Sequence, residues 1–533
     1  MVKKSLLLLG TLFLMILAGC ADPPGASAGK IIPPPSQVSP LSGKWEIIQE
    51  LGTSGYSIET SQQWTGGTVQ FADGAVEFDG NVWDRLTYKI KKVNAADYLM
   101  TKYIPFTDVS ISETQEVDVI TVYAASKYLG EFMELDDKNM ISFVQNKGLL
   151  LKKVSDDADS FFGSPDRNSQ DLYQESIRGT SGILLGIKIP YGSGYRYRTL
   201  WIASDYNEVH PVLVADSLFF PRTSGFWELQ VKSVTEGGKT GNVLTARNVT
   251  AKTLEVHPGK SETAGAGTEA PGIEGSGKDA GPGNGNQQGI DTVPVTTTGE
   301  KDGEDAAERD QEPVARVINY IGNNYVAIEK QTSEGSRLQL LPVDKLSLTT
   351  EIKIHDLMGH KGLSAYLSAR ERAVSELKKD GYSALEETEL GENIGLVRKY
   401  GHWFLVGRIN YKKDMNYEHT DFDLKIIPPP NLIYYDSLVL SWHNIKDRVP
   451  DALDAFASPN RDIALVKTKN KIILYQVVSE QLAETPLAEI DLQEGTSVVM
   501  AEWATGSYVD SWEKSFLAYG AQPLPSGYVR IKQ

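Results

Sequence analysis

The chain has 533 residues, of which 41% are hydrophobic and 23% charged, a composition typical of globular proteins with room for two to four domains. Its 70 acidic residues outnumber 53 basic ones and give a net charge of −17. Such a surface repels phosphate backbones, and no basic stripe offsets it, so we expect no nucleic-acid partner.

The first 20 residues read as a secretory signal. Lys3 and Lys4 precede an apolar run over residues 6–17, and the segment ends with the letters LAGC. The apolar run is too short to span a bilayer comfortably, and small residues follow it, as in a cleavable signal peptide over residues 1–19.

The ending on Cys20 resembles the lipobox of bacterial lipoproteins. In that family the matching cysteine receives a diacylglycerol, becomes the first residue after cleavage, and often gains a third chain, such as palmitate, on its amino group. The resemblance implies a lipid anchor on Cys20 that holds the protein at the extracytoplasmic face of the cell membrane. The alternative is an ordinary signal peptide with a chance cysteine beside it.

Cys20 is the only cysteine, so the exported part would contain no free thiol. This excludes a thiol nucleophile, a cysteine metal site and a structural disulfide. Cleavage after residue 19 removes two lysines and changes the net charge to −19.

Residues 20–40 carry the lipidation site and six prolines, and they predict an extended tether. Residues 41–155 then show eight or nine short apolar-polar strands without a convincing helix, which indicates an antiparallel barrel or sandwich. The predicted strands cover 44–51, 69–71, 76–78, 86–90, 98–103, 117–123, 128–135, 141–144 and 149–151.

Gly43-Lys44-Trp45 stands at the head of this run and resembles the Gly-x-Trp motif that opens lipocalin-like β-barrels. The resemblance implies a lipocalin-like barrel over residues 41–155. Its tryptophan would close the barrel floor under a basic side chain from the last strand, here Lys152 or Lys153. The alternative is a tryptophan buried in any β-sandwich.

Residues 156–177 are polar and predict a linker, and a second, larger β-rich domain follows over 178–256 and 314–533. Between those two parts, residues 257–313 are rich in Gly and acidic residues and nearly free of large apolar ones. Nothing there offsets the entropy of folding, so we predict a disordered insertion. It is either a loop within one domain, which we favour, or a joint between two.

Hairpin patterns recur in this larger domain, roughly seventy to eighty residues apart once the insertion is removed, which indicates a propeller-like repeat or coincidence. The pairs are 183–189 with 198–203, 317–320 with 325–328, 394–398 with 403–406, and 463–467 with 472–475. One amphipathic helix over 363–377, followed by Gly381, predicts a scaffold element that covers a sheet. The expected fold class is mainly β, with one or two helices.

The sequence predicts no catalytic residues, no metal site and no cofactor. There is no Gly-x-Ser-x-Gly or His-Glu-x-x-His sequence, and the P-loop-like stretch 272–279 has Asp279 where a hydroxyl is needed. His355 and His360 are five residues apart and would not share a helix face. Two acidic groups, Asp421 with Asp423 and Asp156, Asp157 with Asp159, offer calcium ligands or simply a solvated surface.

Nine Trp and 24 Tyr in a β-rich exported chain are typical of binding faces, and also of β-sheet cores. These features predict a non-enzymatic, membrane-anchored lipoprotein that acts as a ligand-binding or interaction platform at the cell envelope. Its partner would be a small apolar ligand or an envelope protein. The alternatives are an envelope hydrolase acting on glycans or peptides, with carboxylates as acid and base, and a purely structural protein.

Overall fold

The computed structural model is mainly β and describes most of the chain outside its low-complexity segments. The described residues are 39–52, 64–72, 74–78, 81–109, 111–124, 127–144, 147–158, 179–236, 239–250, 314–332, 335–346, 351–386, 390–478 and 480–531. The predicted signal peptide, Cys20, most of the tether and linker, and the insertion 257–313 lie outside them. No helix in the described part is long and apolar enough to cross a membrane.

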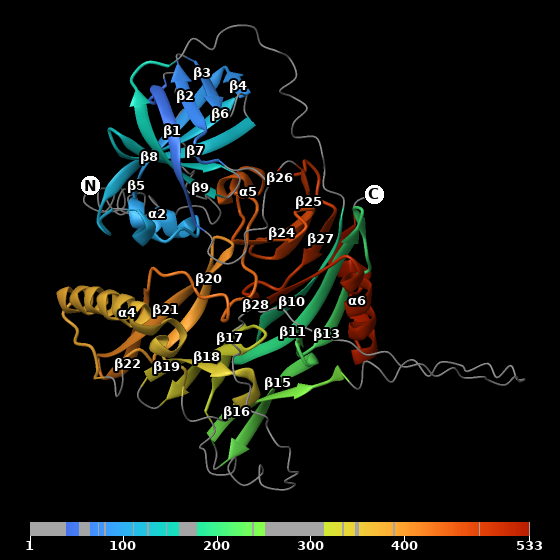
Figure 1. Ribbon diagram of the computed structural model, residues 1–533. Coiled ribbons are helices and arrows are strands. Elements are labelled where there is room, and N and C mark those ends of the chain that lie inside the picture. The colour runs from blue at the N-terminus through green and yellow to red at the C-terminus, as the bar shows by residue number, and fades with distance from the viewer. Residues whose placement is uncertain are drawn as a thin grey trace, which may run out of the picture.

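The N-terminal part is a single nine-stranded antiparallel sheet, here called the N-terminal sheet, which curls on itself at the top of Figure 1. Consecutive strands pair, except that β4 and β5 form the two edges, while β1 pairs with β9. The strands are β1 (Gly43–Leu51), β2 (Thr68–Ala72), β3 (Ala75–Phe78), β4 (Asn81–Asp84), β5 (Leu86–Asn94), β6 (Glu116–Ala124), β7 (Lys127–Asp136), β8 (Asn139–Val144) and β9 (Lys147–Ser155).

Successive side chains along these strands point to opposite faces of the sheet, so the sheet contributes to two separate hydrophobic clusters. Side chains on the concave face, including Trp45, Phe71 and Phe132, fill the inside of the curl. Their neighbours one residue away, such as Met133 on β7, form a second cluster on the convex face. The concave face is therefore packed with protein side chains along its middle.

A short helix, α2 (Ala95–Thr101), covers the convex face, and this corrects the strand predicted over 98–103. Asn94 caps the helix, since its side chain accepts a hydrogen bond from the backbone N–H of Asp97 at 2.9 Å. Tyr98 and Leu99 then turn their side chains onto the sheet. A short 3₁₀ turn, η1 (Phe106–Asp108), follows.

The second region, from Gly179 onward, contains five antiparallel sheets that follow one another along the chain. The first combines β10 (Thr180–Tyr191), β11 (Gly194–Asp205), β12 (Glu208–Val209) and β13 (Leu213–Asp216) with β28 (Ser497–Thr505) and β29 (Gln522–Pro523). The next three sheets have three strands each. The second sheet is formed by β14 (Leu218–Arg222), β15 (Gly225–Glu236) and β16 (Lys239–Asn248), and the third by β17 (Arg316–Ile321), β18 (Tyr325–Thr332) and β19 (Gly335–Pro342). The fourth is formed by β20 (Ile394–Lys399), β21 (His402–Lys413) and β22 (Asn416–Asp423). The fifth has β23 (Asp454–Ala457), β24 (Ile463–Lys467), β25 (Lys471–Val478), β26 (Gln481–Leu482), β27 (Ala488–Asp491) and β30 (Val529–Ile531).

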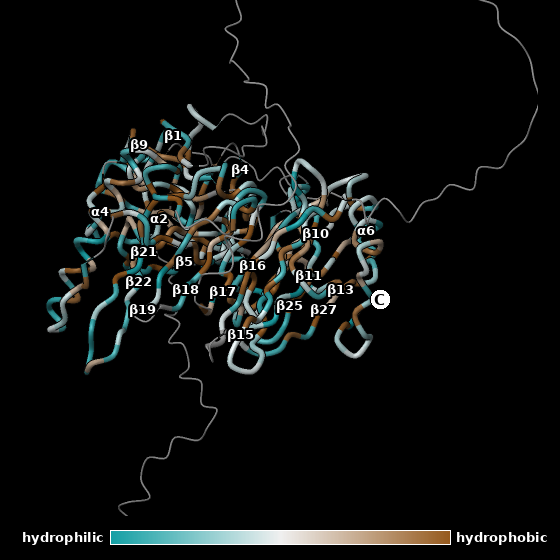
Figure 2. The backbone as a smooth tube through the Cα atoms, turned by 90° about the horizontal axis from the view of Figure 1, so that it is seen from below, coloured by the Kyte–Doolittle hydropathy of each residue, from teal (hydrophilic) through white to brown (hydrophobic). Residues whose placement is uncertain are grey.

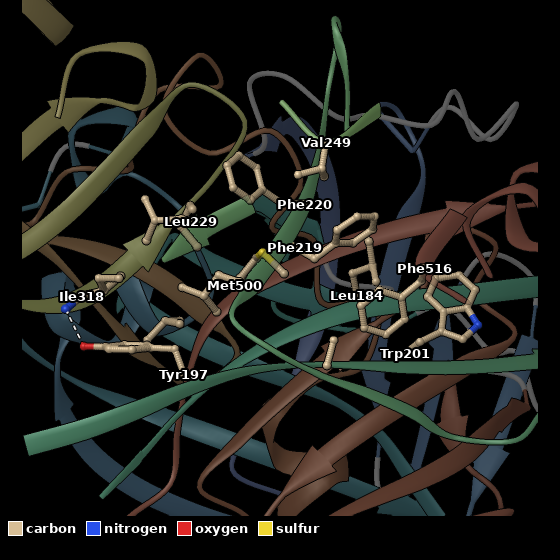
Figure 3. Close-up of a cluster of buried hydrophobic side chains, with 14 of the residues drawn as sticks. Leu184, Tyr197, Trp201, Phe219, Phe220, Leu229, Val249, Ile318, Met500 and Phe516 are labelled. Carbon is tan, nitrogen blue, oxygen red and sulfur yellow. Dashed lines mark hydrogen bonds between the residues drawn. The ribbon is translucent and has the colours of Figure 1, made fainter. Parts of the chain in front are cut away.

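The chain end closes this region on its beginning, because β28 pairs with β10. The large core between the first three sheets includes Trp201, Phe219 and Met500, and the hydroxyl of Tyr197 accepts the backbone N–H of Ile318 at 2.9 Å (Figure 3). Gly182 of β10 leaves room for this core, since a Cβ there would lie 2.4 Å from the Trp201 ring. In Figure 2 the hydrophobic stretches follow the strands.

The predicted hairpins are confirmed: β10 pairs with β11, β17 with β18, β20 with β21, and β24 with β25. The even spacing of these hairpins along the sequence does not correspond to an equal number of sheets between them, however. The first two are separated by the whole β14–β16 sheet, whereas the last three lie in successive sheets of three or more strands.

The described part of the second region has three helices, more than the predicted one or two. The expected scaffold helix is α4 (Ile354–Lys379), which packs on β21 and β22 and is followed by Gly381 at φ 85°. Two shorter ones, α5 (Trp442–Arg448) and α6 (Ser507–Tyr519), were not predicted. The 3₁₀ turns η2 (Val343–Lys345) and η3 (Ser526–Tyr528) complete the elements.

Candidate functional site

A groove of about 790 Å³ opens at one end of the N-terminal sheet, and we call it the mouth groove. Charged side chains from four strands, β5, β6, β7 and β9, dominate its wall. It is lined by Pro40, Ser42, Trp45, Lys92, Glu116, Val117, Asp118, Glu134, Leu135, Asp136, Asp137, Lys138, Lys153, Val154, Ser155 and Asp156. Pro40 is the last residue of the predicted tether, so the chain enters the sheet beside the groove.

Trp45 and Lys153 lie together at the base of the mouth groove. They are register partners on β1 and β9, and the Lys153 ammonium lies 5.5 Å from the centre of the Trp45 ring. Trp45 is 4% exposed, and its indole N–H donates to the carbonyl of Ser42 at 3.0 Å. Lys153 of β9, rather than Lys152, is therefore the lysine that lies over the Trp45 ring.

Gly43 is required by the same geometry. Its φ is +87°, and an added Cβ would lie 2.3 Å from the carbonyl oxygen of Ser155 on β9. A side chain would therefore push β1 away from β9 where the two strands meet at the groove.

The charges of the mouth groove are partly paired. Lys153 contacts Asp156 at 2.7 Å, and Lys92 lies 3.5 Å from Asp118. Glu134 is different, because partial burial and the nearby carboxylates of Asp118 and Asp137 raise its pKa. A group of this kind would gain from a donor or a cation supplied by a ligand.

The convex face of the N-terminal sheet meets the second region around a buried carboxylate, Glu131 of β7. Its side chain is 0% exposed and forms ion pairs with Lys102 and with Lys91 at 3.4 Å. Burial alone would raise the pKa of Glu131, but the two ammonium groups outweigh it and lower the pKa to about 2.

Helix α5 of the second region contributes His443 to this cluster. The His443 ring stacks on Tyr128 with ring centres 5.3 Å apart, hydrogen-bonds the hydroxyl of Tyr123, and lies 3.9 Å from Glu131. Asp447, one turn further along α5, is 3.3 Å from His443. In Figure 1, α5 lies beside β9, at the lower right of the N-terminal sheet.

Tyr103, in the turn after α2, makes a second contact with the second region. Its ring stacks on His402 of β21 at 4.3 Å between centres, and a hydrogen bond joins its side chain to Asp436. The backbone of Tyr103 has φ 59°, which is unusual for a bulky residue and is held by these contacts. Ion pairs Lys425–Asp97 and Arg372–Glu113 flank this junction.

Beneath Tyr103, the Arg398 guanidinium bridges Asp436 at 3.0 Å and Asp454 at 2.8 Å. Burial raises the pKa of Asp436 to about 6, although Arg398 opposes this, and burial with Arg398 nearby lowers the pKa of His402 to about 3. Both carboxylates are engaged by one arginine and are largely buried. The triad therefore joins two sheets rather than presenting an acid and a base to a substrate.

The other predicted residues fall in several places. Asp421 pairs with Arg408 and Asp423 with Lys399, so both serve ion pairs. Cys20 and the stretch 272–279 lie outside the described residues. No group of three or more potential metal ligands occurs within the part of the chain that the structure describes.

Sequence reasoning missed the junction residues altogether. Glu131, His443 and Tyr103 come from segments up to about 340 residues apart, and a lone acid in an alternating strand gives no signal of a distant partner. The one local signal is that Glu131 is an acidic residue flanked by apolar residues in β7.

Comparison with known proteins gives no relative. No protein-family model matches the chain, and no curated protein matches it.

Proposed function

We propose that this chain is an extracytoplasmic envelope lipoprotein, anchored through lipid on Cys20, that binds a ligand in the mouth groove of its N-terminal sheet. The observation that carries the proposal is the groove itself, with Trp45 and Lys153 at its base and Glu134 in its wall. Because the middle of the curl is filled by side chains, the ligand would be a polar molecule held at the mouth.

The lipocalin-like interpretation of residues 41–155 belongs to the same proposal. It is supported by the consecutive strand order, by the pairing of β1 with β9 and by the Trp45–Lys153 contact. For the second region we propose a propeller-like ring, supported by the five successive sheets and by the return of β28 to β10.

The anchor is tested by expressing the chain and its Cys20→Ala variant in a bacterial host. We expect the wild-type chain to incorporate labelled fatty acid and to partition into detergent, and the variant to do neither. Equal labelling and partitioning of the two proteins would contradict the anchor.

The groove is tested by native mass spectrometry of the chain purified from envelopes, compared with its denatured mass. We expect extra mass that is lost on denaturation in the wild type, and less of it in Glu134→Gln and Lys153→Ala. Lys469→Ala is the control, because Lys469 forms an exposed pair with Glu494, lies in the turn between β24 and β25 of another sheet, and does not line the groove. Bare-chain mass in all folded proteins, or equal loading of all variants, would contradict the proposal.

A further inference from the structure

Helix α4 has a sharp kink in its first turns. Gly359 has φ 58° and ψ −148°, which is not helical, inside a helix that otherwise runs from Ile354 to Lys379. An added Cβ at Gly359 would meet nothing within 4 Å, so the requirement for glycine is the backbone conformation alone.

The kink brings two histidines together. In a straight helix, residues five apart point about 140° away from each other around the axis. His355 and His360 flank Gly359, and their rings instead lie 5.2 Å apart between centres, at 79° to each other. Both residues are exposed, so solvent reaches the pair. The sequence predicts that the two histidines do not share a face of a straight helix, and the kink at Gly359 is what brings their rings into contact.

The separation matches shared metal coordination. A metal ion that binds two imidazole nitrogens at about 2.0–2.1 Å, with an angle between 90° and the tetrahedral value, holds the ring centres roughly 4.5–5.3 Å apart. Neutral imidazole suits Cu²⁺, Ni²⁺ and Zn²⁺, whereas Ca²⁺ and Mg²⁺ need oxygen ligands.

We propose that His355 and His360 form a two-histidine site for a borderline divalent transition metal, with Cu²⁺ bound most tightly and water completing its coordination. The site is independent of the mouth groove and of the ligand proposed there. Asp356 lies between the two histidines in sequence, and one of its carboxylate oxygens accepts the backbone N–H of Lys353 at 3.0 Å as part of the helix cap.

The test is calorimetric titration of the purified mature chain, without a histidine tag, with Cu²⁺ and separately with Zn²⁺. We expect one site, tighter for Cu²⁺, and at least about tenfold weaker binding in His355→Ala and in His360→Ala. His419→Ala is the matched control, since His419 is also exposed but its ring nitrogen lies near a serine, 3.5 Å from Ser336. It should bind as the wild type does.

A second measurement separates the pair from any single histidine. The electron paramagnetic resonance spectrum of bound Cu²⁺ should show two coordinating imidazoles in the wild type and one in either variant. Gly359→Ala should weaken binding in parallel, because alanine disfavours the kink. Unchanged Cu²⁺ affinity in a folded His355→Ala/His360→Ala double variant, checked by circular dichroism, would overturn the proposal.

Discussion

Glu131 combines complete burial with two ammonium partners, so its charge is indispensable to the convex face. Glutamine keeps the shape but leaves Lys102, 12% exposed, without its anion. We expect Glu131→Gln to destabilise strands β6 to β8 by about 3 kcal/mol, as breaking a buried pair does. Hydrogen exchange of the amides in these strands measures the local free energy.

The Asp84→Asn variant is the control for Glu131→Gln. Asp84 pairs only with Arg85, and both side chains are at least 74% exposed. Screening by water leaves such a pair little influence, so exchange should not change. An equal effect of the two substitutions would show that Glu131 is not stabilised by its partners.

The depressed pKa of Glu131 also predicts a pH dependence. A carboxylate whose pKa falls from 4.5 to about 2 on folding stabilises the folded state above pH 4.5. That contribution is lost as the pH falls from 4.5 through 2. The stability difference between wild type and Glu131→Gln should therefore shrink over this window in acid unfolding. A constant difference would exclude the ion pairs as its cause.

A comparison of Gly43 with Gly66 distinguishes the cost of backbone strain from the cost of a steric clash. Gly43 and Gly66 have nearly the same φ, +87° and +89°, but only at Gly43 would a Cβ meet the backbone, whereas Gly66 has nothing within 4 Å. We expect Gly66→Ala to cost about 1 kcal/mol and Gly43→Ala clearly more. Urea unfolding of the two variants measures the difference, and equal costs would mean that β9 yields to the added methyl group.

At the scale of elements, the sequence predicts most strands from their short apolar or alternating patterns. Residues 86–90 of β5 alternate between apolar and polar, whereas residues 119–123 of β6 are all buried because both faces of the sheet are covered there. The sequence pattern does not predict helix α2. Tyr98, Leu99 and Met100 are all buried, and such a short continuous apolar run fits a strand as well as a helix.

Helix α5 was missed for a related reason, since it is short and depends on its neighbours, whereas α6 has 13 residues. Ser441 caps α5 through a hydrogen bond from the backbone N–H of Asn444, but seven residues carry too little periodicity to be recognised. Ile445 is buried against the fifth sheet, and that packing stabilises the helix. Tertiary contacts of this kind are not visible in a local window.

The turn after α2 joins the N-terminal sheet to β21 through the ring of Tyr103. Removing its ring should expose His402 and Phe404, on which it packs at 4.3 and 6.1 Å between ring centres. We expect Tyr103→Ala to speed hydrogen exchange at the start of β21 by at least tenfold, which corresponds to about 1.4 kcal/mol. Tyr191→Ala is the control, because Tyr191 is 63% exposed. Unchanged exchange in β21 would show that the Tyr103 contact does not stabilise the start of this strand.

For the molecule as a whole, the sequence locates the two β regions but not their contact. The boundary near residues 156–177 follows from polar composition, and β9 indeed ends at Ser155 while β10 begins at Thr180. The contact itself depends on pairs such as Tyr123 with His443, which composition cannot reveal. The mouth groove was not predicted, because the Gly-x-Trp resemblance implied only that Trp45 closes a barrel floor under a lysine.

The junction predicts that the two regions stay together after the chain is cut. A protease site placed within the predicted linker 156–177 would separate them covalently, yet aromatic contacts at Tyr103 and His443 and two flanking ion pairs would still join them. We expect the fragments of the cleaved protein to elute together in size-exclusion chromatography at micromolar concentration, since these contacts are partly desolvated.

Cleavage of a Tyr103→Ala/His443→Ala variant provides the comparison. Each substitution removes one of the aromatic contacts and leaves both ion pairs, which are partly exposed and contribute less than a fully buried pair. The variant fragments should therefore separate under conditions that keep the wild-type fragments together. Separation of the wild-type fragments as well would mean that the linker alone holds the N-terminal sheet against the second region, and that the mouth groove moves independently of it.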